Sequence, residues 1–159
     1  MAKAPKWKSI VASALDWDQG HATFDAAVRG VTKAKRGRKV RNFPHTVWQL
    51  VEHIRITQHD LVDFCTNPNY SHDLKWPEGY WPETQAPPSD AAWTKSIAQI
   101  RKDTRALARF ATTSTRDLTS KIPHGTGQTY LRTIILAVDH TSYHVGQIVA
   151  VRQLLSDWK

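Results

Sequence analysis

Residues 128–155 read QTYLRTIILAVDHTSYHVGQIVAVRQLL, and they carry the clearest helical pattern of the chain. An α-helix turns by about 100° per residue, so residues three, four and seven apart share one face. With His140 placed at zero on such a wheel, a set of mainly apolar residues falls within about 60° of it. These residues are Thr133, Leu136, Ala137, His144, Gln147, Val151, Leu154 and Leu155. The pattern predicts a long helix whose apolar face is buried against other helices.

Residues 6–29 show the same period. Ile10, Trp17 and Phe24 fall on one face of this segment, and Gly30 follows it as a helix stop. We therefore predict one continuous first helix, with its apolar stripe turned toward the rest of the bundle.

Two more helices are predicted between these segments, and each is introduced by a capping residue. Thr46 and Gln49 have the spacing of a capping box and open a helix that runs to residue 66, before Pro68. Ser89 is a good N-cap and opens a helix over residues 89–112. No pair of alternating strands is found. The sequence therefore predicts an all-α fold, a four-helix bundle.

The segment between the second and third helices, residues 67–88, cannot be helical, because it holds five of the eight prolines. A connection of about 20 residues is long enough to run the length of a 30 Å helix. We therefore predict that the second and third helices lie parallel and that this segment is the crossover between them. Its aromatic residues indicate that it packs against the bundle; they are Tyr70, Trp76, Tyr80 and Trp81.

Length and composition fit one soluble globular domain that spans residues 1–159. Apolar residues make up 40% of the chain and charged residues 23%, which argues against disorder. The single cysteine, Cys65, excludes an intrachain disulfide and a cysteine-based zinc site. No apolar run reaches the ~20 residues that a membrane-spanning helix needs, and no signal peptide is apparent at the start. A cytoplasmic protein without membrane contact is expected.

The formal net charge of +8 has a local origin. Six of the 22 basic residues lie within residues 33–41, and this run contains no aromatic residue. Nucleic-acid binders more often spread basic residues over a face and interleave aromatics, so nucleic acid is not an expected partner. The run is interpreted as a solvated loop, with a weak contact to an anion as the alternative. Its basic residues are Lys33, Lys35, Arg36, Arg38, Lys39 and Arg41.

The eight histidines contain one spacing that favours metal binding. His140 and His144 are four residues apart, so both imidazoles can reach one ion from the core-facing stripe of the last helix. Burying two histidines side by side is costly unless each has a polar partner, and a shared metal ion supplies one. A polar pair within the core is the alternative. On the second helix, His53 lies at the edge of the buried face, whereas His59 lies opposite and His45 lies outside the helix or on its wet side.

Three imidazoles would leave ligand positions open, as catalytic metal sites do. The donor set suits Zn, Ni, Fe, Mn or Cu. For three further residues, the sequence leaves two interpretations open. His21 either lines a pocket or is a hydrogen-bonded core histidine, and Tyr143 either lines the pocket or packs. Gln147 either orients a ligand or a substrate, or fills polar space in the core. Cys65 lies well around the helix from His53 and is not predicted as a ligand or nucleophile.

Two stretches of the chain together resemble the DinB-like (DinB/YfiT-like) superfamily. They are WQLVEHIRI at residues 48–56, and DHTSYHVGQIV at residues 139–149. Segments NPNY at residues 67–70, WPEGYWP at 76–82 and IPHG at 122–125 resemble one branch of it, so the resemblance covers nearly the whole chain. It implies a four-helix bundle with parallel second and third helices and a divalent metal ion on three histidines.

Carried over to this sequence, the metal ligands would be His53, His140 and His144. Zn and Ni are the metals expected first. The resemblance also implies a metal-dependent enzyme acting on a small molecule, since some members are transferases or isomerases that use a low-molecular-weight thiol such as bacillithiol, mycothiol or glutathione. A hydrolase is a further possibility of the same kind. The alternative function is a non-catalytic, stress-related bundle that holds a metal or a small ligand, and a homodimer is compatible with either.

Overall fold

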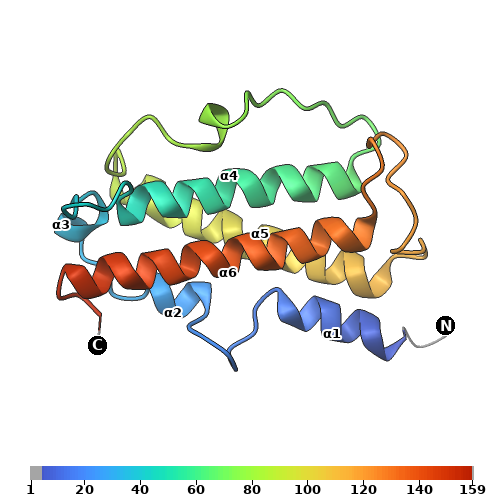
Figure 1. Ribbon diagram of the computed structural model, residues 1–159, viewed down its shortest axis with the longest axis horizontal. Helices are drawn as coiled ribbons and strands as arrows, with labels where there is room; N and C mark the ends of the chain where they lie inside the picture. Colours follow the sequence, from blue (N-terminus) through green and yellow to red (C-terminus); the bar gives the residue numbers. More distant parts are fainter. Residues whose placement is uncertain (1–4, 159) are drawn as a thin grey trace.

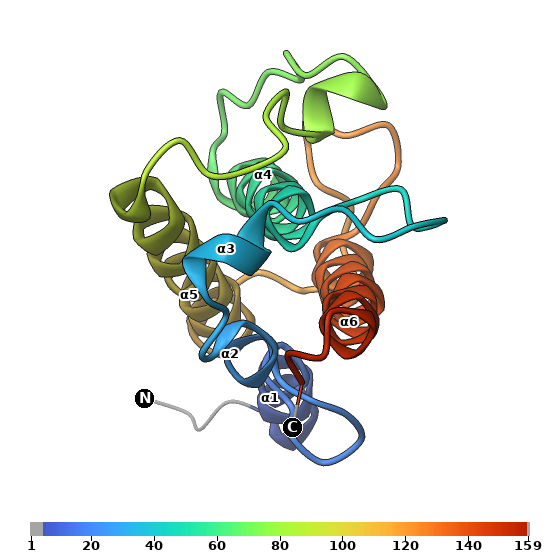
Figure 2. The same cartoon turned by 90° about the vertical axis from the view of Figure 1, so that its left-hand side faces the viewer.

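The structure is a computed structural model that describes residues 5–158. Within that range it contains no β-strand, and its long helices lie side by side as a bundle, with the shorter helices packed along one side and one end (Figure 1, Figure 2). The predicted all-α class and helical bundle are confirmed. The helices are α1 (Lys6–Ala14), α2 (Phe24–Val28), α3 (Lys33–Arg36), α4 (Val47–Thr66), α5 (Asp90–Thr113) and α6 (Tyr130–Leu154), with a 3-10 turn η1 (Glu78–Tyr80).

The prediction of one helix over residues 6–29 is wrong, because the chain forms two helices there, α1 and α2, joined by an irregular connection. The connection is rich in residues that favour turns over helix, including Asp16, Asp18 and Gly20. Thr23 then starts α2 afresh, with its hydroxyl accepting a hydrogen bond from the backbone N–H of Ala26. The predicted apolar stripe is buried only at Phe24, in α2, since Ile10 is 59% exposed and Trp17 is 47% exposed.

The helices α4 and α5 begin where their capping residues predicted, and α6 also begins at a capping residue. Thr46 and Gln49 form the capping box that opens α4. The hydroxyl of Ser89 caps α5, and the hydroxyl of Thr129 caps α6 by accepting from the backbone N–H of Arg132. Short-range sequence signals therefore place the three helices that carry the interior of the bundle.

Contacts between α4 and α5 advance in the same direction along both helices. Near the two helix starts, the rings of Trp48 and Trp93 lie 6.4 Å apart. Farther along, the side-chain amide of Gln58 donates to the carbonyl of Ile100 at 3.3 Å and to the hydroxyl of Thr104 at 2.6 Å. The chain between these helices returns along the length of the bundle, as Figure 1 shows. Hereafter this segment, residues 67–89, is called the crossover.

The crossover is attached to the start of α4 by two hydrogen bonds. The hydroxyl of Thr46 donates to the carbonyl of Gln85 at 2.7 Å, and the indole N–H of Trp48 donates to the hydroxyl of Thr84 at 2.9 Å. Bonds of this kind hold an otherwise irregular connection against one face of the bundle.

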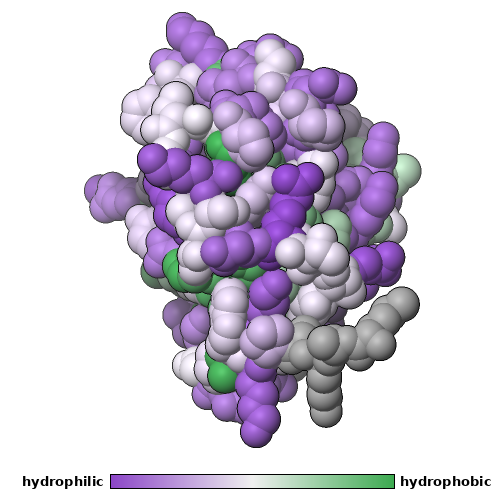
Figure 3. Space-filling view, turned by 90° about the vertical axis from the view of Figure 1, so that its right-hand side faces the viewer, coloured by the Kyte–Doolittle hydropathy of each residue, from purple (hydrophilic) through white to green (hydrophobic). Residues whose placement is uncertain are grey.

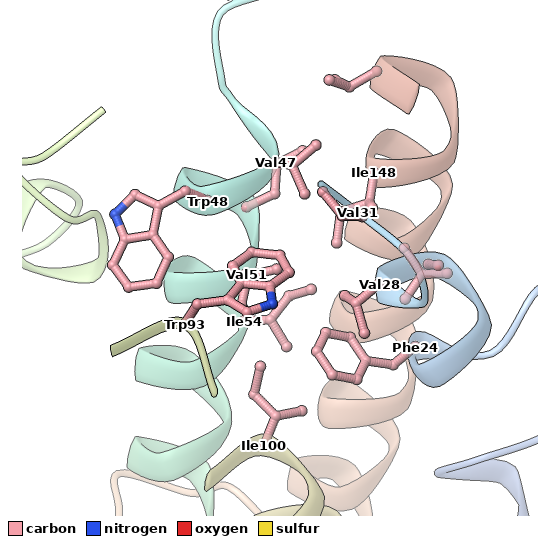
Figure 4. Packing of buried hydrophobic residues seen from close by; sticks show 14 residues of the cluster. Phe24, Val28, Val31, Val47, Trp48, Val51, Ile54, Trp93, Ile100 and Ile148 are labelled. Atoms are coloured by element: carbon pink, nitrogen blue, oxygen red, sulfur yellow. The ribbon is translucent and has the colours of Figure 1, made fainter. Parts of the chain in front are cut away.

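Two clusters of buried apolar side chains fill the interior. In the first, side chains from α2, α4, α5 and α6 point toward one another, among them Phe24, Ile54, Ile100 and Ile148 (Figure 4). Burying a side chain of this size contributes about 1.5–3 kcal/mol. The second cluster lies toward the other end of the long helices; its fully buried members are Leu107, Ala111, Leu118 and Ile134.

The interpretation of residues 33–41 as a solvated loop is wrong for their first half. Residues 33–36 form α3, and Arg36 donates to the carboxylate of Asp90 at 2.6 Å while its guanidinium lies 4.8 Å from the centre of the Trp93 ring. Lys35 donates to the carbonyl of Leu155 at 3.1 Å. Part of the basic run therefore docks the segment before α4 onto α5 and the end of α6.

The end of the bundle where α5 connects to α6 is mostly hydrophilic, with only scattered hydrophobic residues (Figure 3). Among the described residues, no helix combines the length and the hydrophobicity needed to cross a membrane.

Candidate metal centre

The structure brings His53, His140 and His144 together. His53 lies in the second turn of α4, and the other two lie one turn apart in α6, which packs beside α4. The Nε2 atoms of His53 and His140 are 3.0 Å apart, and one ring nitrogen from each of the three residues lies within 4.8 Å of the others. The three ring centres are 4.5 to 4.8 Å apart.

Hydrogen bonds fix two of these rings in the form that a metal needs. The Nδ1 atom of His53 lies 2.8 Å from the backbone carbonyl of Tyr80, and Nδ1 of His144 lies 2.7 Å from the side-chain oxygen of Gln147. Both partners are acceptors here, so each Nδ1 carries the proton and each Nε2 keeps its lone pair. Of the two interpretations of Gln147, this contact matches orientation of a ligand.

The donor set fits a divalent ion. Two nitrogens bonded to one tetrahedral ion at ~2.0–2.1 Å lie roughly 3.3 Å apart. The separation of 3.0 Å between the Nε2 atoms of His53 and His140 is close to that value. The distance of 4.8 Å that encloses all three nitrogens is wider than the ~4 Å expected of a closed ligand set.

Burial keeps the three imidazoles neutral. Loss of water lowers the pKa of His53 to about 4 and that of His140 to about 3, and it lowers the pKa of His144 as well. The neighbouring rings act in the same direction on His53 and His140, because two imidazolium charges so close together repel each other. Neutral imidazole is the metal-binding form, so near pH 7 protons do not compete with a metal for these nitrogens.

The crossover supplies an aromatic support that sequence reasoning missed. The indole of Trp81 lies flat on the ring of His53, with centres 3.8 Å apart and planes 2° apart. The ring of His45 lies on the opposite face of the same indole, also at 3.8 Å. His45 lies just outside α4, which agrees with one of its two predicted positions, and it is nevertheless part of the site's surroundings. The aromatic content of the crossover was the one available signal.

A cavity of about 500 Å³ opens beside the three histidines. Its walls are mainly apolar or aromatic and come from α4, α6 and the crossover. Tyr143 stands at its mouth and is 63% exposed, so this residue lines the cavity and does not pack in the core. The other lining residues besides the histidines are Thr57, Asp60, Leu61, Trp76, Pro77, Tyr80, Trp81 and Leu136.

Other candidates lie away from this centre. His21 is exposed, with Nδ1 2.9 Å from the carbonyl of Ala22, so it is neither a core histidine nor part of the metal centre. His59 is exposed, as predicted, and lies 3.3 Å from Asp103. Cys65 is buried, and loss of water raises the pKa of its thiol to about 12, which suits neither a ligand nor a nucleophile.

The fold and the site together define a class: a helical bundle in which adjacent helices bring three neutral imidazoles to one point beside an aromatic-walled cavity. Sequence comparison agrees with that class. Residues 16–148 match the sequence profile of the DinB superfamily, so the chain belongs to the DinB superfamily. No curated protein and no solved structure matches the chain at a significant level.

Proposed function

We propose that His53, His140 and His144 bind one divalent metal ion and that the protein is a metal-dependent enzyme acting on a small molecule. The observation that carries the proposal is the convergence of three imidazole nitrogens, two of them with their lone pairs set by hydrogen bonds on the far side of the ring. Zn and Ni are the metals expected first, since three neutral imidazoles suit both, while Fe, Mn and Cu remain compatible.

The cavity beside the histidines supports an enzyme over a metal store. Three protein ligands leave coordination positions open, which is the arrangement of catalytic sites, whereas structural zinc sites close all four positions with protein groups. When bound, a divalent ion here supplies Lewis-acid chemistry and lowers the pKa of a water or thiol at neutral pH.

The chain's own residues perform three tasks in this proposal. Tyr80 and Gln147 hold the protons of two ligand rings on the side away from the ion, through their oxygen atoms. Trp81 covers one face of His53 and keeps water from it. The apolar wall at Leu136 and Trp76 binds the carbon skeleton of the substrate. A low-molecular-weight thiol is the proposed cosubstrate, and the reaction a thiol-dependent transfer or isomerisation.

Titration of the chelator-treated protein with Zn²⁺ and Ni²⁺ in a calorimeter tests the metal centre. One ion should bind per chain. His53→Ala, His140→Ala and His144→Ala should each cost more affinity than the roughly 10–100-fold that loss of an outer partner costs. His59→Ala and His72→Ala are matched controls that should leave affinity unchanged, since both side chains are exposed. Circular dichroism should show helices in all five variants. Unchanged affinity in the three ligand variants would refute the proposed centre.

A thiol-transfer screen tests the enzyme. The protein, with and without metal, is mixed with 1-chloro-2,4-dinitrobenzene and each of glutathione, bacillithiol and mycothiol. In the reaction sought, a C–S bond forms, the C–Cl bond breaks, and the thiol proton passes to solvent. Metal-dependent turnover that the His140→Ala variant lacks would support the proposal. Tight metal binding with no turnover of any thiol would favour the non-catalytic metal-binding alternative.

A further inference from the structure

The cavity beside the three histidines does not end there. A second cleft, of about 410 Å³, shares Asp60 and Leu61 of α4 with it. The first cavity reaches His140 and Leu136 of α6, and the second reaches Arg132. Because the two cavities share these lining residues, they adjoin between α4 and α6, and we call them together the substrate groove.

The substrate groove has a defined length. Its ends are His140 and Arg132, which are eight positions apart on α6. At a rise of 1.5 Å per residue, the distance along the helix is about 12 Å. A molecule that fills the groove is therefore elongated, with its two ends in different surroundings.

The middle of the substrate groove has apolar side chains on α4, and the crossover lies beside it. Leu61 and Phe64 lie along its α4 side. The crossover is held by Asp60, whose two carboxylate oxygens each accept a hydrogen bond at 2.8 Å, one from the hydroxyl of Tyr70 and one from that of Tyr80. Both carboxylate oxygens of Asp60 already accept hydrogen bonds from these two hydroxyls. The role of Asp60 is therefore to hold the crossover in place beside the groove.

The far end of the substrate groove carries one unbalanced positive charge. Arg132 is exposed there, and no carboxylate within residues 5–158 pairs with its guanidinium. The neighbouring His124 directs its Nε2 at the carbonyl of Phe64, at 2.9 Å. Thr126 and Gln128 complete the lining with neutral polar groups. A guanidinium in such a place binds a planar monoanion, a carboxylate, through two parallel hydrogen bonds.

We propose that the substrate groove binds an elongated small molecule with an apolar middle and a terminal carboxylate, which Arg132 recognises. The opposite end of the molecule lies at the three histidines and is the end that reacts. This inference rests on the proposed function for the reacting end alone, because the carboxylate end depends only on Arg132 and the groove walls.

Octanoate and its neutral counterpart octanamide are the probes, titrated into the metal-free protein and followed by calorimetry. Octanoate should bind at least about tenfold more tightly, as expected of a charge-assisted hydrogen bond in a partly dry groove. The preference should fall below about twofold in Arg132→Gln and be partly retained in Arg132→Lys. Arg105→Gln is the matched control, since Arg105 is equally exposed but lines none of the cavities described. Equal binding of the two probes to the native protein, or a preference that Arg132→Gln retains, would overturn the inference.

A second arm, with zinc-loaded protein, separates this inference from the proposed function. Suberate has a carboxylate at each end and should bind more tightly than octanoate once a metal is present, because its second carboxylate reaches the histidines. Failure of zinc to bind would overturn the proposed function and the reacting end, while an octanoate preference would still support the Arg132 end. If zinc binds but suberate gains nothing over octanoate, the groove does not connect the two ends and the inference is wrong.

Discussion

His53 is held in the proposed metal centre by contacts on several sides of its ring. Its Nδ1 faces the carbonyl of Tyr80, one ring face lies on Trp81, and its edge faces His140 and His144. A ring held from so many directions has one orientation, so its lone pair is aimed before any ligand arrives. Preorganisation of this kind reduces the entropy lost on binding.

Replacing Trp81 should therefore weaken metal binding without unfolding the bundle. We expect Trp81→Ala to lower zinc affinity by about 10–100-fold, the usual cost of losing an outer partner of a metal ligand. Trp81→Phe should recover part of that loss, because a smaller ring still covers His53. Calorimetric titration with Zn²⁺ measures both.

His45→Ala is the matched control for this prediction. It removes the outer ring of the stack but leaves Trp81 in contact with His53. Its effect on zinc affinity should be the smaller of the two. A Trp81→Ala protein that melts earlier yet binds zinc as tightly as the native chain would show that the indole only packs.

The sequence predicted the position of some of these residues and gave no information on the position of others. His53, His140 and His144 could be selected because a helix turns by a regular angle per residue. The spacing of residues in the sequence therefore gives the direction in which each side chain points. Trp81 lies in an irregular segment, where no period relates sequence to direction. Its contact with His53 depends on how the whole crossover folds back. His21 was misjudged for a related reason, since its predicted face existed only if the first helix was continuous.

At the scale of the helices, the start of α4 has a double role. The Thr46 hydroxyl accepts from the backbone N–H of Gln49 and also donates to the carbonyl of Gln85 in the crossover. We expect Thr46→Ala to lower the free energy of unfolding by about 1–2 kcal/mol, through the lost cap and the lost hydrogen bond to the carbonyl of Gln85. Urea denaturation measures the change.

Ser89→Ala provides the comparison for Thr46→Ala. Ser89 caps α5 in the same way but lies at an exposed position. It should cost no more than about 1 kcal/mol, the typical value for a cap alone. Equal losses in the two variants would mean that the bond from α4 to the crossover adds nothing to stability.

The short helix α3 gives a second prediction at this scale. Arg36 pairs with Asp90 and lies over the ring of Trp93, whereas Arg38 is exposed and has neither contact. We expect Arg36→Ala to cost about 1 kcal/mol of stability from the cation–π contact and the ion pair together. Arg38→Ala should change stability by less than about 0.5 kcal/mol. Thermal unfolding of the two variants measures this difference in stability. Equal melting temperatures would contradict the docking role of Arg36.

Element boundaries were predictable where a capping residue marks them, as at Thr46 and Ser89. They were not predictable near residue 15, where apolar periodicity continues through a stretch that prefers turns. There the two local signals disagree, and the outcome depends on how α1 and α2 pack against the rest of the bundle. A single sequence shows both the apolar periodicity and the turn-forming residues, but it does not show which of the two determines the local structure.

For the whole molecule, the buried imidazoles make stability depend on pH. In the unfolded chain a histidine binds a proton near its ordinary pKa of 6.5, but in the folded protein the pKa of His53 is about 4 and that of His140 about 3. Between these values the unfolded state holds more protons. The free energy of unfolding of the metal-free protein should therefore fall as the pH falls from about 6.5 toward 3. Urea denaturation midpoints at pH 7.5 and pH 4.5 measure this.

A triple variant in which His53, His140 and His144 are all replaced by Ala isolates the contribution of these rings. Its stability should change much less between pH 7.5 and pH 4.5 than that of the native chain. Asp90 and Asp117 do not confuse the comparison, because hydrogen bonds lower the pKa of each carboxyl below its ordinary value of 3.8, which lies below both pH values that are compared. An unchanged pH dependence in the triple variant would assign the effect to other groups.

The bond between the crossover and His53 has an evolutionary consequence. The acceptor is the main-chain carbonyl of Tyr80, an atom that any amino acid at position 80 would provide. Mutations can therefore alter the side chains that this segment shows to a substrate while the imidazole keeps its tautomer. Changes in the side chains of this segment and retention of the His53 tautomer therefore depend on different atoms of the same stretch of chain. A scaffold with that separation can vary the wall of the cavity without changing how the imidazole is held.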